Sequence, residues 1–189
     1  MKRLFITLAS VFLTVPLQCA TLERLTLDDM ISKSSAIVRG KVMDSWTAFT
    51  GSVIYTHYGI QASESYKGAG QNRLEIVVTG GTVKGVSQNF SGSPTLNKGD
   101  EFVFFLWTSR AGLTQIIGLT QGLFALPPND SSGPASDPAS DPIATRAPTR
   151  ELMLDPATAR PVKDAALSMR VSELRSRIAD TLAGVPHEQ

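Results

Sequence analysis

The sequence predicts a mainly β protein, a small closed or partly open barrel of five or more strands with a short helix before it and an amphipathic helix after it. Three observations carry this prediction. Apolar and polar residues alternate from Ala36 to Leu126, a period of two that is typical of half-buried strands. Glycine-rich and polar turn signals divide that region into short segments. A stripe of apolar residues at helical spacing follows near the C-terminus.

The first twenty residues predict an export signal. Lys2 and Arg3 form a positive n-region, a short apolar stretch follows, and Ala20 is a small residue suited to cleavage. The apolar stretch is shorter than the roughly 20 residues that a membrane-spanning helix needs, so we expect an exported, periplasmic or secreted product without an integral membrane span. Lipid attachment at Cys19 is the rival interpretation, but Pro16 stands where a lipoprotein signal carries Leu.

Composition limits the function classes. Cys19 is the only cysteine, so the exported chain has no internal disulfide, which is more typical of a bacterial envelope protein than of a eukaryotic secreted module. Lys and Arg total 18 against 17 Asp and Glu, and they form no basic stripe. We therefore expect no nucleic-acid binding, because such binding draws most of its affinity from clustered positive charge.

The elements of the predicted barrel domain, residues 21–126, follow in order. A short helix begins at Thr26, whose hydroxyl and the carboxylate of Asp29 fit a capping box. Strands are predicted at residues 36–43, 53–66, 74–79, 102–107, 113–119 and 123–126, with a weaker segment at 83–90. Every residue from Phe102 to Trp107 is apolar, which predicts that both faces of this strand are covered and that Trp107 lies in the core.

The C-terminal segment, residues 151–189, contains the predicted helix at about 168–183. Its apolar stripe consists of Leu167, Val171, Leu174, Ile178 and Leu182, and we expect it to cover the 102–107 strand. Residues 127–150, between barrel and helix, hold six of the eleven prolines and a tandem Ala-Ser-Asp-Pro repeat. Such a composition has little to bury and predicts a mobile linker.

The order of the strands fits an OB-type barrel, and short motifs within it resemble the netrin-like module, the barrel of the tissue inhibitors of metalloproteinases. The motifs are Ala36-Ile-Val-Arg-Gly-Lys-Val42, Tyr66-Lys-Gly68, Leu74-Glu-Ile-Val-Val78 and Lys98-Gly-Asp-Glu-Phe-Val-Phe-Phe-Leu106, spread over about half of the chain. The resemblance implies an OB-like fold and a protein- or peptidase-binding role. It implies no site residue, because the N-terminal cysteine and the disulfides of those inhibitors have no counterpart in the exported chain.

No catalytic, cofactor or metal site is predicted. His57 is the one internal histidine, and a surface position on the outward face of the second predicted strand explains it, whereas a zinc site needs about three or four ligands. The chain has no Gly-x-Ser-x-Gly elbow for a serine nucleophile. The glycine-rich segment Gly80–Gly85 lacks the spacing of a phosphate loop.

Aromatic residues are the remaining candidates for a binding site. Trp46, Phe49, Tyr55 and Tyr58 gather around the first predicted loop, and loops of this kind border the ligand face of OB-type barrels. Aromatic anchors dominate protein-binding hot spots, and exposed rings also stack on sugars, while core packing is the structural alternative. The preferred hypothesis is a non-enzymatic module that binds an exported protein. Binding of a carbohydrate or envelope polymer is the second, and an enzyme of unknown type is the third.

Overall fold

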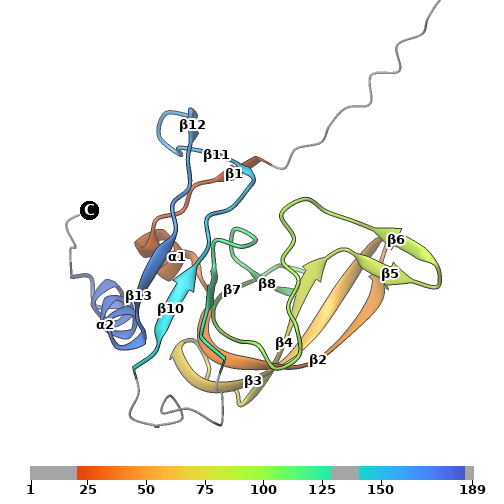
Figure 1. The fold of residues 1–189 in the computed structure, drawn as a ribbon, viewed down its shortest axis with the longest axis horizontal. Coiled ribbons are helices and arrows are strands. Elements are labelled where there is room, and N and C mark those ends of the chain that lie inside the picture. The colour runs from red at the N-terminus through yellow and green to blue at the C-terminus, as the bar shows by residue number, and fades with distance from the viewer. Residues whose placement is uncertain (1–20, 129–140, 186–189) are drawn as a thin grey trace, which may run out of the picture.

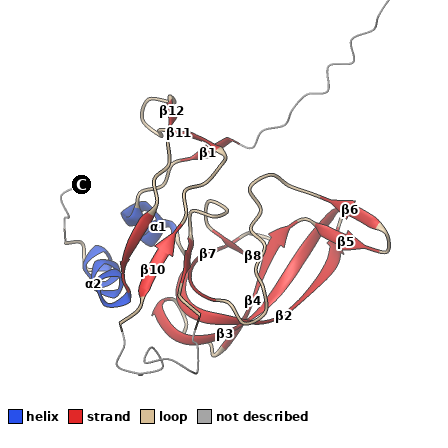
Figure 2. Cartoon of the chain, in the orientation of Figure 1, coloured by secondary structure: helices blue, strands red, loops and turns tan. Residues whose placement is uncertain are grey.

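The computed structural model describes residues 21–128 and 141–185, and Figure 1 shows how they are arranged. The predicted export signal and residues 129–140 of the predicted linker lie outside this range. The described chain is mainly β, as predicted, and strands dominate the cartoon in Figure 2. In these two ranges, no helix has the length and apolar character needed to cross a membrane.

Eight strands form the main sheet, in the order β13-β10-β9-β7-β2-β3-β4, with β8 paired to β7. Their bounds are β2 Ala36–Thr50, β3 Val53–Lys67, β4 Arg73–Thr79, β7 Glu101–Thr108, β8 Thr114–Ile116, β9 Leu123–Ala125, β10 Ile143–Arg146 and β13 Leu167–Arg170. Two smaller sheets hold β1 Thr21–Glu23, β11 Leu152–Leu154 and β12 Pro161–Val162, and the hairpin of β5 Gly81–Val83 and β6 Val86–Gln88. The helices are α1 Leu27–Lys33 and α2 Val171–Leu182.

The main sheet is open among the described residues, so the closed form of the barrel, one of the two forms expected from the sequence, is wrong. Closure would require a hydrogen-bonded ladder between β4 and a strand on the far side of β7. The short strand β8 lies beside β4, but within the described residues it pairs only with β7. Instead of returning to β4, the chain adds β9, β10 and β13 beyond β7, so the sheet grows outward on that side.

A long hairpin of β2 and β3 gives the sheet its bend. The register shifts between Ile37 and Val38, between Arg39 and Gly40, and between Val42 and Asp44, and such bulges increase bending and twist. The turn at the end uses Gly51 at φ +63°. Residues 44–59, the far part of this hairpin, are called the arm below. Figure 1 shows the arm reaching away from the two helices.

Two clusters of buried apolar residues use the two faces of the sheet. Val103 and Phe105 of β7 belong to the cluster that includes both helices, and Phe104 and Leu106 belong to the cluster inside the curve of the sheet. Alternate residues of a strand point to opposite faces, so β7 is covered on both sides, as its unbroken apolar run predicted. Trp107 was expected in the core but is 39% exposed, because it lies near the end of β7, beyond these clusters.

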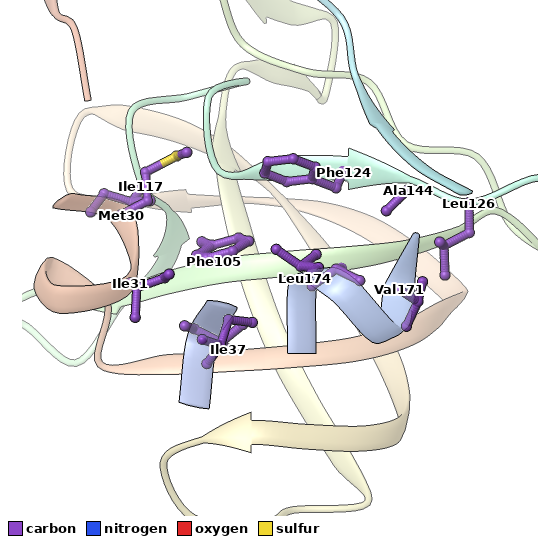
Figure 3. Packing of buried hydrophobic residues seen from close by; sticks show 12 residues of the cluster. Met30, Ile31, Ile37, Phe105, Ile117, Phe124, Leu126, Ala144, Val171 and Leu174 are labelled. Carbon is purple, nitrogen blue, oxygen red and sulfur yellow. The ribbon is translucent and has the colours of Figure 1, made fainter. Parts of the chain in front are cut away.

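The C-terminal helix α2 is present and packs on the main sheet. Val171, Leu174 and Ile178 of the predicted stripe are buried, and Figure 3 shows Leu174 close to Phe105 of β7. Leu182, at the end of the stripe, is 47% exposed. The helix was expected to begin at about residue 168, but residues 168–170 belong to strand β13 and pair with β10.

Polar contacts hold α2 at its place. Arg177 donates to both carboxylate oxygens of Asp28 on α1, at 3.0 Å each. Arg175 donates to Glu64 of β3, which also accepts from Arg39. Burial alone would raise the pKa of Glu64, but the two guanidinium groups outweigh it and hold the pKa below its usual value. Charge pairs therefore join α2 to α1 and to β3.

The described part of the predicted linker, residues 141–150, does not behave as an exposed tether. Ile143–Arg146 form β10, which pairs with β9 at Thr145 and along its length with β13. Ala144 and Arg146 are buried. Because residues of β10 contribute to the core between the sheet and α2, this segment is part of the folded unit.

Limited trypsin digestion should distinguish the two arginines of this segment. Arg146 lies in a strand with 4% of its surface exposed, whereas Arg150 follows β10 and is exposed. We expect cleavage after Arg150 to precede cleavage after Arg146, because a protease needs a locally opened, accessible backbone. Mass spectrometry of the fragments over time measures the order. An early cut after Arg146 would contradict the placement of β10.

Candidate functional site

The four aromatic candidates occupy different environments. Trp46 and Phe49 are exposed, at 45% and 46% of their surface, and Tyr55 is half-buried. Tyr58 is only 4% exposed and belongs to the inner cluster, where its Oη accepts a hydrogen bond of 3.4 Å from the Leu96 N–H. Tyr58 is thus a core residue and leaves the set of surface candidates.

The register of the arm places the two exposed rings on opposite faces. Trp46 pairs with His57, which points away from the inner cluster, and Phe49 pairs with Ile54. Because directly paired residues project to the same side and the side alternates along a strand, Trp46 lies on the outer face of the arm and Phe49 on the inner face. The arm therefore presents an aromatic ring on each side.

Trp46 is held by a stacked histidine. The Trp46 and His57 rings lie 5.2 Å apart between centroids and are inclined by 14°. His57 Nδ1 is hydrogen-bonded to Glu75 Oε1 of β4 at 2.7 Å, and only 12% of the His57 side chain is exposed. The sequence placed His57 on an outward face, and the structure gives it the further role of fixing the orientation of Trp46.

Charged side chains border Trp46 on the outer face. Asp44 lies opposite Gly59, and a Cβ at Gly59 would collide with the Asp44 carboxylate. Arg73 Nη2 donates to Asp44 Oδ2 at 2.8 Å. Asp44 and Arg73 were not among the candidates from the sequence, because their proximity depends on the bulge before Asp44 and on the pairing of β3 with β4. The alternation of residues along β4 was the one sequence signal that could have placed Arg73 and Glu75 on the same face.

The β5–β6 hairpin packs against the arm and adds two exposed apolar residues, Val86 and the nearby Phe90. The Thr47 hydroxyl donates to the Thr82 carbonyl at 2.7 Å, and the Thr56 hydroxyl donates to the Gly80 carbonyl at 2.8 Å. These contacts give the arm support from a second hairpin. The exposed side chains of the arm therefore lie on a hairpin that is hydrogen-bonded to a second hairpin, and not on a flexible loop.

Elsewhere, a cavity of about 500 Å³ opens beside β9 and β10. Phe102, Leu123 and Ala125 form its apolar part, and Arg150 and Glu151 stand at its border. In the described ranges, no group of three or more His, Cys, Asp or Glu residues is placed to hold a metal ion. The exposed rings of the arm are therefore the most distinctive surface feature of the described chain.

Comparison with models of protein families, with curated proteins and with solved structures finds no match for this chain.

Proposed function

We propose that this chain is an exported, non-enzymatic binding module that holds a protein partner with the arm. The observation that carries the proposal is the exposure of Trp46 and Phe49 on opposite faces of one braced hairpin. A hairpin with a ring on each side fits a groove, because both rings lose contact with water when the hairpin enters it. Aromatic side chains of this kind are the residues that most often dominate binding energy.

The energetic case depends on area. Each aromatic side chain buries about 150–250 Å² when fully covered, and apolar burial contributes roughly 25 cal/mol per Å². Both rings start nearly half exposed, so each has substantial area left to bury.

The netrin-like resemblance of the sequence makes an exported metallopeptidase the first partner to test.

Carbohydrate binding is a second candidate, and one observation favours it. The Trp46 ring lies parallel to the supporting His57 ring, next to the charged groups of Asp44, Arg73 and Glu75. A fixed flat ring beside hydrogen-bonding groups can stack on a sugar ring while those groups bind its hydroxyls. This mode would need Trp46 but not Phe49, which lies on the other face.

Replacing Trp46 and Phe49 together by alanine should abolish partner binding without unfolding the chain. We expect at least a tenfold loss in the capture of exported proteins by the immobilised chain, because both anchors are removed. The melting temperature should change by only a few degrees, since exposed side chains contribute little to stability. Quantitative mass spectrometry of the captured proteins and a metallopeptidase inhibition assay provide the readout.

The matched control is Trp107→Ala, which removes an indole of similar exposure, 39%, from outside the arm. Retention on insoluble polysaccharide separates the two candidates. If the partner is a protein, both Trp46→Ala and Phe49→Ala should lose binding. If the ligand is a sugar, Trp46→Ala should lose binding to the polysaccharide and Phe49→Ala should keep it. Unchanged capture by the double variant would contradict the proposal.

A further inference from the structure

One face of the Trp46 ring is open to a binding partner. The other face lies on His57, with 5.2 Å between the ring centroids and 14° between the ring planes. Because 45% of Trp46 remains exposed and His57 covers only one face, the outward face of the indole is accessible to solvent. The hydrogen bond from His57 to Glu75 holds the supporting ring in place, so the indole is presented in a fixed orientation.

The strand register places two carboxylates next to this ring. Trp46 pairs with His57 of β3. In the next row on the same face, Gly59 of β3 lies between Asp44 of β2 and Glu75 of β4. Neighbouring rows on one face are separated by two residues along each strand, about 7 Å. Both carboxylates therefore lie in the row adjacent to Trp46.

The positive groups of this face begin one row further away. Lys41 of β2 and Arg73 of β4 pair with the next residue of β3 on the same face. Arg73 reaches back and donates from Nη2 to Asp44 Oδ2 at 2.8 Å, so it balances one carboxylate. In the described ranges, the Glu75 carboxylate has no lysine or arginine partner. One negative charge next to Trp46 is therefore left without such a partner.

Two acceptor atoms of this surface have no donor. Asp44 Oδ1 and His57 Nε2 are buried, and neither has a hydrogen-bond partner in the part of the chain that the structure describes. Because the Glu75 carboxylate can only accept, His57 Nδ1 is the donor to it, which leaves Nε2 of the neutral ring as an acceptor. Charges and unpaired acceptors sum to the potential at a surface. The potential around Trp46 is consequently negative, which fits a positively charged partner group.

We propose that an arginine side chain of the protein partner stacks on the outward face of Trp46. This inference rests on the proposed function, because it specifies which group of the partner the arm holds. A guanidinium group is planar, is always charged and stacks on aromatic faces, and tryptophan is the aromatic residue that attracts cations most strongly. Asp44 and Glu75 supply the negative potential beside it. The partner that fits is a segment with an exposed arginine.

Nuclear magnetic resonance of the indole N–H groups tests this contact with a small probe. N-acetyl-arginine amide is titrated into the isotope-labelled chain without its predicted export signal, and N-acetyl-citrulline amide, which has a similar shape without the charge, is the matched ligand. The arginine probe should shift the Trp46 signal, and the citrulline probe should bind at least fivefold more weakly. Trp107, the only other tryptophan, is 39% exposed, and its signal is the internal control that should not move.

Three variants separate the effect of charge from that of packing. Glu75→Gln keeps an acceptor for His57 but removes the negative charge, so it should raise the dissociation constant of the arginine probe at least threefold. Arg73→Gln removes the positive group bonded to Asp44 and should lower that constant about twofold. Phe49→Ala, on the inner face, should leave it unchanged. Circular dichroism verifies that each variant is folded.

The outcomes distinguish this inference from the proposed function. The proposed function fails if the variant without Trp46 and Phe49 captures partners as the wild type does, whereas the arginine contact fails if the arginine probe leaves the Trp46 signal unmoved. Equal binding of the two probes, or unchanged binding in Glu75→Gln, would also overturn the arginine contact. A Trp46 shift with a chitin oligosaccharide and none with the arginine probe would replace it by sugar stacking.

Discussion

Replacing Arg146 by methionine is expected to lower the free energy of unfolding by about 3–5 kcal/mol, the cost of breaking a buried ion pair from one side. Arg146 and Asp164 form a two-pronged pair, with 5% and 4% of their side chains exposed. Arg146 Nη2 donates to Asp164 Oδ1 at 2.7 Å, and Nη1 donates to Oδ2 at 3.1 Å. Methionine fills much of the same volume but leaves the carboxylate of Asp164 buried without its counter-charge.

The pair also joins two segments of the chain, residues 146–149 and residues 164–165. Arg146 lies on β10, its Nη2 donates to the Ala165 carbonyl, and Asp164 accepts from the Thr149 N–H. Burial alone would raise the pKa of Asp164, but the Arg146 guanidinium and this N–H outweigh it and hold the pKa below its usual 3.8. A carboxyl with a lowered folded pKa stabilises the fold above its unfolded pKa and loses that contribution as the pH falls through the folded value.

Urea unfolding at neutral pH and at pH 3 measures both effects. The wild type should lose stability on acidification below about pH 4, and Arg146→Met should lose less, because the variant no longer has this pair to protonate. Arg73→Met is the matched control. Its pair with Asp44 is 67% and 46% exposed, and such surface pairs contribute only about 0–1 kcal/mol. Equal losses for the two methionine variants would show that the Arg146–Asp164 pair does not stabilise the fold.

A double replacement tests whether the stability loss of Arg146→Met comes from the unpaired buried charge of Asp164. Removing both charges, with Arg146→Met and Asp164→Leu together, should recover most of the stability lost in the single variant, because apolar substitutes of similar volume avoid an unpaired buried charge. No recovery would mean that the loss came from packing of β10.

The local sequence pattern predicted those features that depend on neighbouring residues alone, namely which strand and which helix face are buried. The unbroken apolar run of residues 102–106 and the helical stripe of Leu174 and Ile178 can be read from the local sequence, and the side chains of both are buried in the structure. The open sheet was not predictable in this way, since it depends on whether β4 and β8, which are far apart in sequence, form hydrogen bonds. Strand β10 was missed because four residues among prolines carry a weak local signal, while their pairing with β13 supplies the order.

The same limit applies to the candidate site. Composition indicated that aromatic residues gather near the first hairpin, but it did not give their faces. The bulge between Val42 and Asp44 resets the alternation, so it decides that Trp46 shares a face with His57. Tyr58, on the inner face, is buried with Ile60.

Leu174→Ala is the second substitution with a large expected effect, a loss of about 2–5 kcal/mol in the free energy of unfolding. Leu174 is 1% exposed and belongs to a cluster with Phe105 of β7 and Phe124 of β9. Removing its three outer carbons leaves a cavity between α2 and the sheet, and the surrounding residues relax only partly.

The shape of the unfolding transition shows whether α2 and the sheet unfold together. The cluster that holds Leu174 also contains Ala144 of β10 and Met30 of α1, so we expect α2 and the sheet to unfold together. Far-ultraviolet circular dichroism and tryptophan fluorescence, which reports on Trp46 and Trp107, should then give coincident curves for wild type and variant. Leu182→Ala, at a position 47% exposed on the same helix, serves as the control and should cost less than about 0.5 kcal/mol. If Leu174→Ala cost no more than this control, α2 would not contribute to the core, and its buried stripe would have to be explained by contacts other than those with β7 and β9.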